Sequence, residues 1–229
     1  IYLKGDLANG AFYWTDLANP ERETRIVRAM GVDSPRWIDN TPFLVFAEVE
    51  GSDRGQVQLH DTATGRTTVV TRDAGVKSFA YGWLAPEFGD EVLVLALVDA
   101  AAIGIWRQTS PGHWERVQTI PPPAESRHKV IGSPEPLVCA GRSYISAVIK
   151  SEGGTLRFRD SEIWLFGVEA PDAPPYAERM DADDDERTRS DPETLVSGNR
   201  VHVYYNIHDP EDGYLIGHRQ VVPRGPAAR

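Results

Sequence analysis

A short phrase that returns four times along the chain constrains the fold more than any other feature. In each copy a proline and a charged residue precede an apolar run, a turn and a second apolar run. The prolines are Pro35, Pro86, Pro134 and Pro192. Copies that recur at roughly fifty residues with strand-like content are typical of a β-propeller, in which each repeat is one four-stranded blade.

Strand-like stretches follow each phrase, at residues 43–49, 91–98, 142–149 and 200–207, and helix signals are almost absent. We therefore predict an all-β chain that forms one five-bladed β-propeller over residues 1–229, with four-stranded antiparallel blades around a central channel. Four blades are expected at residues 31–73, 76–121, 130–181 and 190–222. Residues 1–30 supply three strands of the fifth, and a C-terminal strand completes it and closes the ring.

Composition narrows the set of partners. The formal net charge of −10 argues against a nucleic-acid or anionic-membrane partner, because such surfaces need excess Lys and Arg. No apolar run approaches the roughly eighteen residues of a membrane span. Cys139 is the single cysteine, so no intramolecular disulfide can form, and we expect a buried, inert thiol. We expect a monomer. The chain begins at Ile1 rather than Met, which leaves secreted and cytoplasmic locations both open.

In a propeller the first strand of each blade lines the central channel, so the repeated phrases are expected to meet at one mouth. Six charged side chains would converge there: Asp33, Arg36, Glu87, Glu135, Asp191 and Glu193. Carboxylates that share a cleft repel one another, which raises some pKa values and leaves other groups ionised. A general acid and a general base need such a separation of pKa values.

Several segments resemble those of the five-bladed glycoside hydrolases of family 43, in the same order along the chain. Residues 83–87 (Trp-Leu-Ala-Pro-Glu) look like its Trp-Ala-Pro-acid segment, and residues 131–136 stand where the family has Glu-Gly-Pro. Residues 33–35 are similar to its Asp-Pro opening, and residues 203–208 to its Tyr-x-x-Tyr-His strand. The hairpin at residues 58–65 also resembles those of TolB-like blades.

The resemblance implies a glycan-acting protein that hydrolyses a glycosidic bond without a cofactor or catalytic metal. Asp33 would be the general base, Glu87 the pKa modulator and Glu135 the general acid. In an inverting glycosidase the acid and base carboxyl groups stand roughly 6.5–9.5 Å apart. The residues expected to bind the carbohydrate are Arg36, Trp37, Trp83, Asp191, Glu193 and His208.

Other readings of the same residues remain open. The proline can simply end the crossover between blades and leave the charge in solvent at the rim, while the tryptophans pack in the core. The propeller can also bind a carbohydrate, another small molecule or a protein without turning it over. A third reading is a lyase or isomerase that uses His208 as its base.

Metal binding is suggested only at two places. The acidic run at residues 181–186 spaces its acids like a calcium loop, but it lacks the glycine and the glutamate that such a loop needs. We therefore favour a solvated acidic loop, and Ca²⁺ binding is the second interpretation. His208 lies beside Asp209 and Asp212, which suits a metal or a tuned acid. The sequence has no phosphate-binding loop, nucleophile elbow or His-Glu-x-x-His motif.

Overall fold

The fold is all-β, as predicted. The computed structural model describes residues 1–5, 10–28, 31–33, 35–48, 55–151, 161–168, 176–181, 188–209 and 213–223. They form five antiparallel sheets that follow one another in chain order, with one 3₁₀ turn at Pro86–Phe88. None of the described residues forms a helix long and apolar enough to cross a membrane.

Each sheet is a meander in which every strand pairs with its neighbour in sequence. The first sheet holds β1 (Tyr2–Lys4), β2 (Ala11–Asp16) and β3 (Asn19–Arg28). The second holds β4 (Arg36–Trp37), β5 (Phe43–Ala47), β6 (Val57–Asp61) and β7 (Arg66–Val69). The third holds β8 (Lys77–Ala85), β9 (Glu91–Val98), β10 (Ala102–Ser110) and β11 (His113–Ile120). The fourth holds β12 (Val130–Cys139), β13 (Arg142–Lys150), β14 (Ser161–Gly167) and β15 (Ala177–Arg179). The fifth holds β16 (Thr188–Ser197), β17 (Arg200–Asp209) and β18 (Gly213–Val221).

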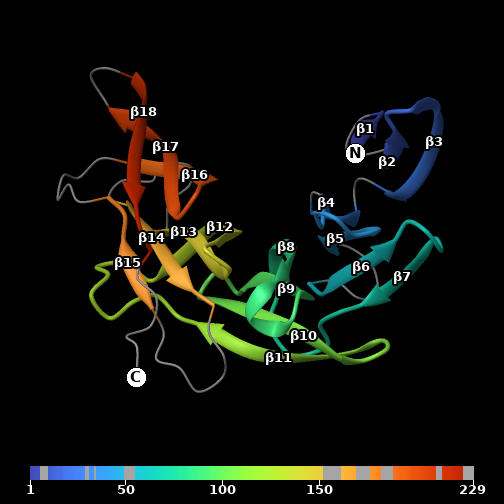
Figure 1. The fold of residues 1–229 in the computed structure, drawn as a ribbon, viewed down its shortest axis with the longest axis horizontal. Helices are drawn as coiled ribbons and strands as arrows, with labels where there is room; N and C mark the ends of the chain where they lie inside the picture. The colour runs from blue at the N-terminus through green and yellow to red at the C-terminus, as the bar shows by residue number, and fades with distance from the viewer. Residues whose placement is uncertain are drawn as a thin grey trace.

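The sheets are arranged as an arc, with β4, β8, β12 and β16 on its inner side (Figure 1). Adjacent inner strands contact one another: β8 contacts β4 and β12, and β12 contacts β16. This is the blade-like arrangement expected from the repeat, because the first strand of each meander faces the inside.

The first and last sheets lie at the two ends of the arc, and the expected composite sheet is not formed by the described residues (Figure 1). The first sheet contains only β1, β2 and β3. Strand β18 pairs with β17, from Val201↔Val221 to Asp209↔Gly213, within the blade expected at residues 190–222.

The core lies between consecutive sheets from the second to the fifth, and strands β5, β9 and β13 are buried on both faces. On β9, Leu93 and Leu95 pack toward the fourth sheet, whereas Val94 and Ala96 pack toward the second. Side chains alternate between the two faces of a strand, so burial of both faces requires a continuous apolar run such as that of β9. A third cluster, which includes Val203, joins the fourth and fifth sheets.

The inner strands share a bulge near their beginning. The register shifts by one residue between Ser78 and Tyr81 on β8, between Gly132 and Glu135 on β12, and between Ser190 and Glu193 on β16. One residue in each bulge has a positive φ, and the next is buried. The positive-φ residues are Phe79 (52°), Ser133 (45°) and Asp191 (48°), and the buried ones are Ala80, Pro134 and Pro192.

The position of the bulge shows that one of the four predicted copies of the phrase was aligned wrongly. The phrases at residues 133–135 and 191–193 lie inside an inner strand, where proline is tolerated because a bulge leaves one residue without a ladder hydrogen bond. The phrase at residues 85–87 instead ends β8 and enters the 3₁₀ turn. The second copy is therefore Phe79-Ala80-Tyr81, which has neither a proline nor a charge.

Close packing predicts the effect of one glycine substitution. A Cβ on Gly104 would lie 2.3 Å from Cη2 of Trp106, whose ring is only 2% exposed in the core between the second and third sheets. The ring cannot move without losing packing contacts, so we expect Gly104→Ala to lower the free energy of unfolding by about 1–3 kcal/mol in chemical denaturation. Gly31→Ala is the control, because a Cβ there meets nothing within 4 Å. Equal stability of the two variants would contradict this account.

Candidate functional site

Four side chains occupy equivalent positions on the four inner strands, immediately after the bulge. They are Arg36, Tyr81, Glu135 and Glu193, which pair across their sheets with Val45, Leu95, Ser146 and Tyr204. Before β4 the register shifts by one residue in the same way. The amide of Asp33 donates to the carbonyl of Ala47, and Arg36, three residues later, pairs with Val45, two residues earlier on the partner strand. We call these four residues the inner row.

Direct contacts link the first three members of the inner row. The guanidinium of Arg36 lies over the ring of Tyr81, 4.1 Å from its centroid. The hydroxyl of Tyr81 donates a hydrogen bond to Oε1 of Glu135 at 2.8 Å. Each contact joins one sheet to the next, so a cation, an aromatic ring and a carboxyl group from three sheets are held together.

The environment of Glu135 raises the pKa of its carboxyl group. Burial raises its pKa above the ordinary value, and the charges of Glu193 and Asp191 act in the same direction. The hydrogen bond from Tyr81 and the charge of Arg36 oppose this rise without cancelling it. A half-buried carboxyl group with a raised pKa, close to other carboxylates, has the property required of a proton donor.

Tyr81 serves as a hydrogen-bond donor in this arrangement. Burial raises the pKa of its hydroxyl well above the usual range, and the negative charge of Glu135 adds to the rise. The charge of Arg36 acts in the opposite direction but is outweighed. The phenol therefore stays protonated near neutral pH and holds Glu135 in place.

Two aspartates accept hydrogen bonds from the bulges of neighbouring sheets. Oδ2 of Asp33 accepts a hydrogen bond from the amide of Phe79 in the bulge of β8, at 2.8 Å. Oδ1 of Asp191 accepts one from the hydroxyl of Ser133 in the bulge of β12, at 3.4 Å. The carboxylates of the repeated phrase thus fix the backbone that presents the inner row.

Two of the predicted site residues lie at the other end of the inner strands. Glu87 is in the turn that follows β8, where it accepts hydrogen bonds from the amide of Ser143 at 3.2 Å and from its hydroxyl at 2.9 Å. Trp83 is 6% exposed, and its Nε1 donates to the same hydroxyl at 2.8 Å. Trp83 is therefore a core residue, and Glu87 is not among the groups that act on Glu135.

Two further candidates, Trp37 and His208, are not members of the inner row. Trp37 is 38% exposed, follows Arg36 on β4, and donates from Nε1 to the carbonyl of Thr41 at 3.0 Å. His208 is exposed near the end of β17 and packs edge-to-face on Tyr214, with 5.0 Å between ring centroids. The inner row therefore contains Arg36, Glu135 and Glu193 of the predicted residues, and Tyr81 in addition.

Sequence reasoning missed Tyr81 because it relied on a proline and a charge to find each copy. Its copy carries Ala80 at the proline position, and an uncharged side chain follows. The spacing to the next strand gives no signal for it either, because Ala80 lies farther from the start of β9 at Glu91 than Pro134 and Pro192 lie from the starts of β13 at Arg142 and β17 at Arg200.

The described residues contain no group of three or more potential metal ligands. Of the acidic run at residues 181–186, only Asp181 belongs to the described part, and it is fully buried. Its Oδ1 accepts hydrogen bonds from Nε of Arg179 and from the amide of Ile163, both at 3.0 Å. Asp181 is thus engaged within the fold, while calcium binding by the rest of the run stays a prediction.

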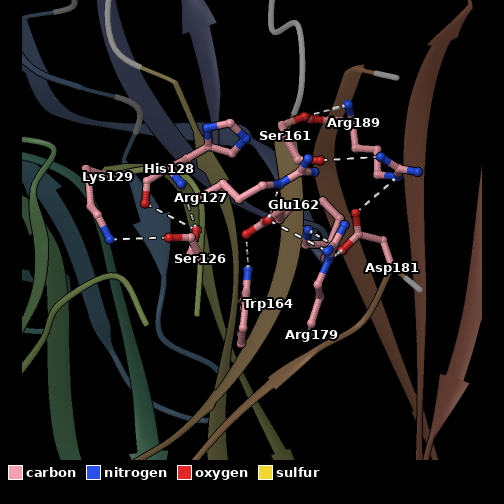
Figure 2. A network of polar contacts seen from close by, with 11 residues as sticks. Ser126, Arg127, His128, Lys129, Ser161, Glu162, Trp164, Arg179, Asp181 and Arg189 are labelled. Atoms are coloured by element: carbon pink, nitrogen blue, oxygen red, sulfur yellow. Dashed lines mark hydrogen bonds and ion pairs between the residues drawn. The ribbon is translucent and has the colours of Figure 1, made fainter. Parts of the chain in front are cut away.

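Figure 2 shows the network to which Asp181 belongs, between the fourth and fifth sheets. Arg189 is 1% exposed, and its Nε lies 3.2 Å from Oδ2 of Asp181. Glu162, also buried, accepts a hydrogen bond from Nε1 of Trp164 at 2.9 Å. Buried charges are tolerated only when they are paired, so we regard this network as a structural junction.

Comparisons with known proteins identify no family. The sequence matches no protein-family model and no curated protein. Among solved structures, a sialidase of Trypanosoma rangeli in complex with sialic acid has 8% identity and a TM-score of 0.45, over 77% of this chain and 29% of the sialidase. A fungal alcohol oxidase of the AA5 family in complex with copper has 10% identity and a TM-score of 0.32, over 85% and 54% of the respective chains. The chain thus spans less than two thirds of either structure's length.

The contact between Tyr81 and Glu135 makes a prediction about titration. Because the phenol donates to the carboxylate and thereby lowers its pKa, Tyr81→Phe should raise the pKa of Glu135 further. The raised pKa means that stability falls as pH rises between the unfolded and folded pKa values, and this fall should be larger in the variant. NMR titration of ¹³C-labelled glutamate carboxyl groups measures the shift. Tyr214→Phe, at a residue 78% exposed, should leave it unchanged; an unchanged pKa in Tyr81→Phe would refute the contact.

The buried network predicts a large loss of stability. Asp181→Asn removes an anion that faces Arg189, so that a buried cation loses a counter-charge. We expect the free energy of unfolding to fall by about 3–5 kcal/mol, measured by denaturant unfolding. Glu115→Gln is the matched control, because that side chain is 61% exposed and its pair with His113 is at the surface. A similarly small effect of both substitutions would show that the network is dispensable.

Proposed function

We propose that this protein acts on a carbohydrate at the inner row and hydrolyses a glycosidic bond with Glu135 as the proton donor. The observation that carries the proposal is the raised pKa of Glu135 in a fixed position beside other carboxylates. A group that protonates a leaving oxygen near neutral pH needs both a raised pKa and a fixed position.

Each member of the inner row has a role in this proposal. Tyr81 orients Glu135 through its hydrogen bond, and Arg36 supplies a cation that is able to bind sugar hydroxyl or carboxylate oxygens. Glu193 and Asp191, rather than Glu87, raise the pKa of the acid. Membership of glycoside hydrolase family 43 stays a prediction, as does a closed five-bladed ring.

Asp33 is the proposed general base. It reaches the bulge of β8 and bonds the amide of Phe79, two residues before Tyr81. This contact orients its carboxylate toward the part of β8 that carries the inner row. Glu193 is the competing carboxylate, because its charge acts on Glu135 directly. Sodium azide restores turnover to glycosidase variants that lack the base, so rescue of Asp33→Ala or of Glu193→Ala would distinguish the two.

The central test is hydrolysis of a glycan array by wild type and by Glu135→Gln. Loss of general acid catalysis should lower kcat/KM by about 10²–10⁴-fold while the fold and the thermal midpoint are retained. Glu125→Gln is the control, because Glu125 is exposed in the segment between β11 and β12. Wild-type turnover by Glu135→Gln would overturn the assignment of the acid.

Two other outcomes would replace the proposal. Glycan binding that survives Glu135→Gln, in a wild type without turnover, would indicate a binding propeller. Activity on a non-glycosidic substrate that is lost in His208→Ala would indicate a lyase or isomerase. Neither outcome changes the geometry of the inner row.

A further inference from the structure

A second potential site lies between the second and third sheets, at the end opposite the bulges. It is a cavity of about 320 Å³, next to Glu91, which pairs with Ala85 at the end of β8. The cavity is lined by Phe43, Leu59, Asp61, Thr64, Arg66, Thr68, Glu91, Val92 and Gln108. It is separate from the inner row, whose residues follow the bulge at the beginning of the inner strands.

The apolar part of the lining continues the core. Leu59 belongs to the cluster between the second and third sheets, and Phe43 and Val92 pack against the same cluster. The two sheets diverge beyond these residues and leave space that the core does not fill. Cavities of this size with apolar walls and a few polar groups are typical of small-molecule sites.

The two carboxylates in the lining are already engaged. Asp61 accepts hydrogen bonds from the hydroxyl of Thr64 at 2.8 Å and from the amide of Ala63 at 2.9 Å, and the first of these lowers its pKa most. Glu91 accepts two from the guanidinium of Arg107, at 2.6 and 2.9 Å, which also lower its pKa. Both groups are ionised near neutral pH and have donors, so neither requires a ligand cation.

Arg66 differs from these groups. Its side chain is exposed at the mouth of the cavity and forms no ion pair or hydrogen bond with another residue in the described part of the chain, although it stands directly opposite Asp61 in the β6–β7 ladder. Outside the lining, Nε1 of Trp114 is buried without a hydrogen-bond partner, and Trp114 pairs with the lining residue Gln108 across the β10–β11 ladder. Buried donors without an acceptor are rare in folded proteins.

We propose that this cavity binds a small organic carboxylate with an apolar body. The apolar body packs against Phe43, Leu59 and Val92. The carboxylate pairs with the guanidinium of Arg66, which matches the planar geometry of two oxygens. The site is independent of the function proposed for the inner row.

The probe is 4-phenylbutyrate, compared with its neutral amide and with 4-phenylbutylamine. Calorimetry and ¹⁵N chemical shifts should show binding of the carboxylate, with shifts at Arg66, Thr68 and Gln108. Arg66→Gln should weaken binding by at least about tenfold, because a charge-assisted bidentate pair is lost. Arg72→Gln, an exposed arginine outside the lining, should bind as wild type does.

Several results would overturn the proposal. These are equal affinity for the carboxylate and the amide, unchanged affinity in Arg66→Gln, and absence of binding by the carboxylate at millimolar concentration. Preference for the amine would also overturn it, because Asp61 and Glu91 would then govern the site. Retained affinity in Glu135→Gln, by contrast, is expected, because the two sites are separate.

Discussion

Apolar contact between consecutive sheets is the interaction on which the rest of the structure depends. The third and fourth sheets each bury one face against the sheet before and the other against the sheet after, as the side chains of β9 show. A small meander is marginal by itself, so the sheets gain stability by stacking. The stacking also fixes the relative position of the inner strands, and therefore of every residue that they present.

The bulge converts this stacked scaffold into a site. An extra residue re-aims the side chain that follows it, and the same event on successive inner strands places Arg36, Tyr81, Glu135 and Glu193 in one row. The buried proline or alanine fills the space under the bulge, and Asp33 and Asp191 hold neighbouring bulges by hydrogen bonds. Proline and aspartate in the repeated phrase thus shape the backbone at the bulge, and the residue after the proline belongs to the inner row.

Charge is used in two ways in the protein. In the junction between the fourth and fifth sheets, Asp181 and Arg189 are fully buried and neutralise each other, which suits a fixed contact. In the inner row, Glu135 is only half-buried and lies among carboxylates, so its proton affinity rises while its position stays fixed. The first arrangement gives specificity of packing, and the second gives a titratable group within reach of a ligand.

The sequence by itself determined the all-β class, the order of the sheets and the strands at residues 43–47, 91–98 and 142–149, because alternation and turn residues are local properties. It also predicted that Arg36 and Glu135 would lie close to one another on the inner strands, and both contact Tyr81 there. Tertiary structure alone decided that Tyr81 completes the row and that Glu87 and Trp83 contact Ser143 instead. The reason is physical: a one-residue bulge and the stacking of sheets determine which side chains meet, and neither leaves a fixed pattern in the local sequence.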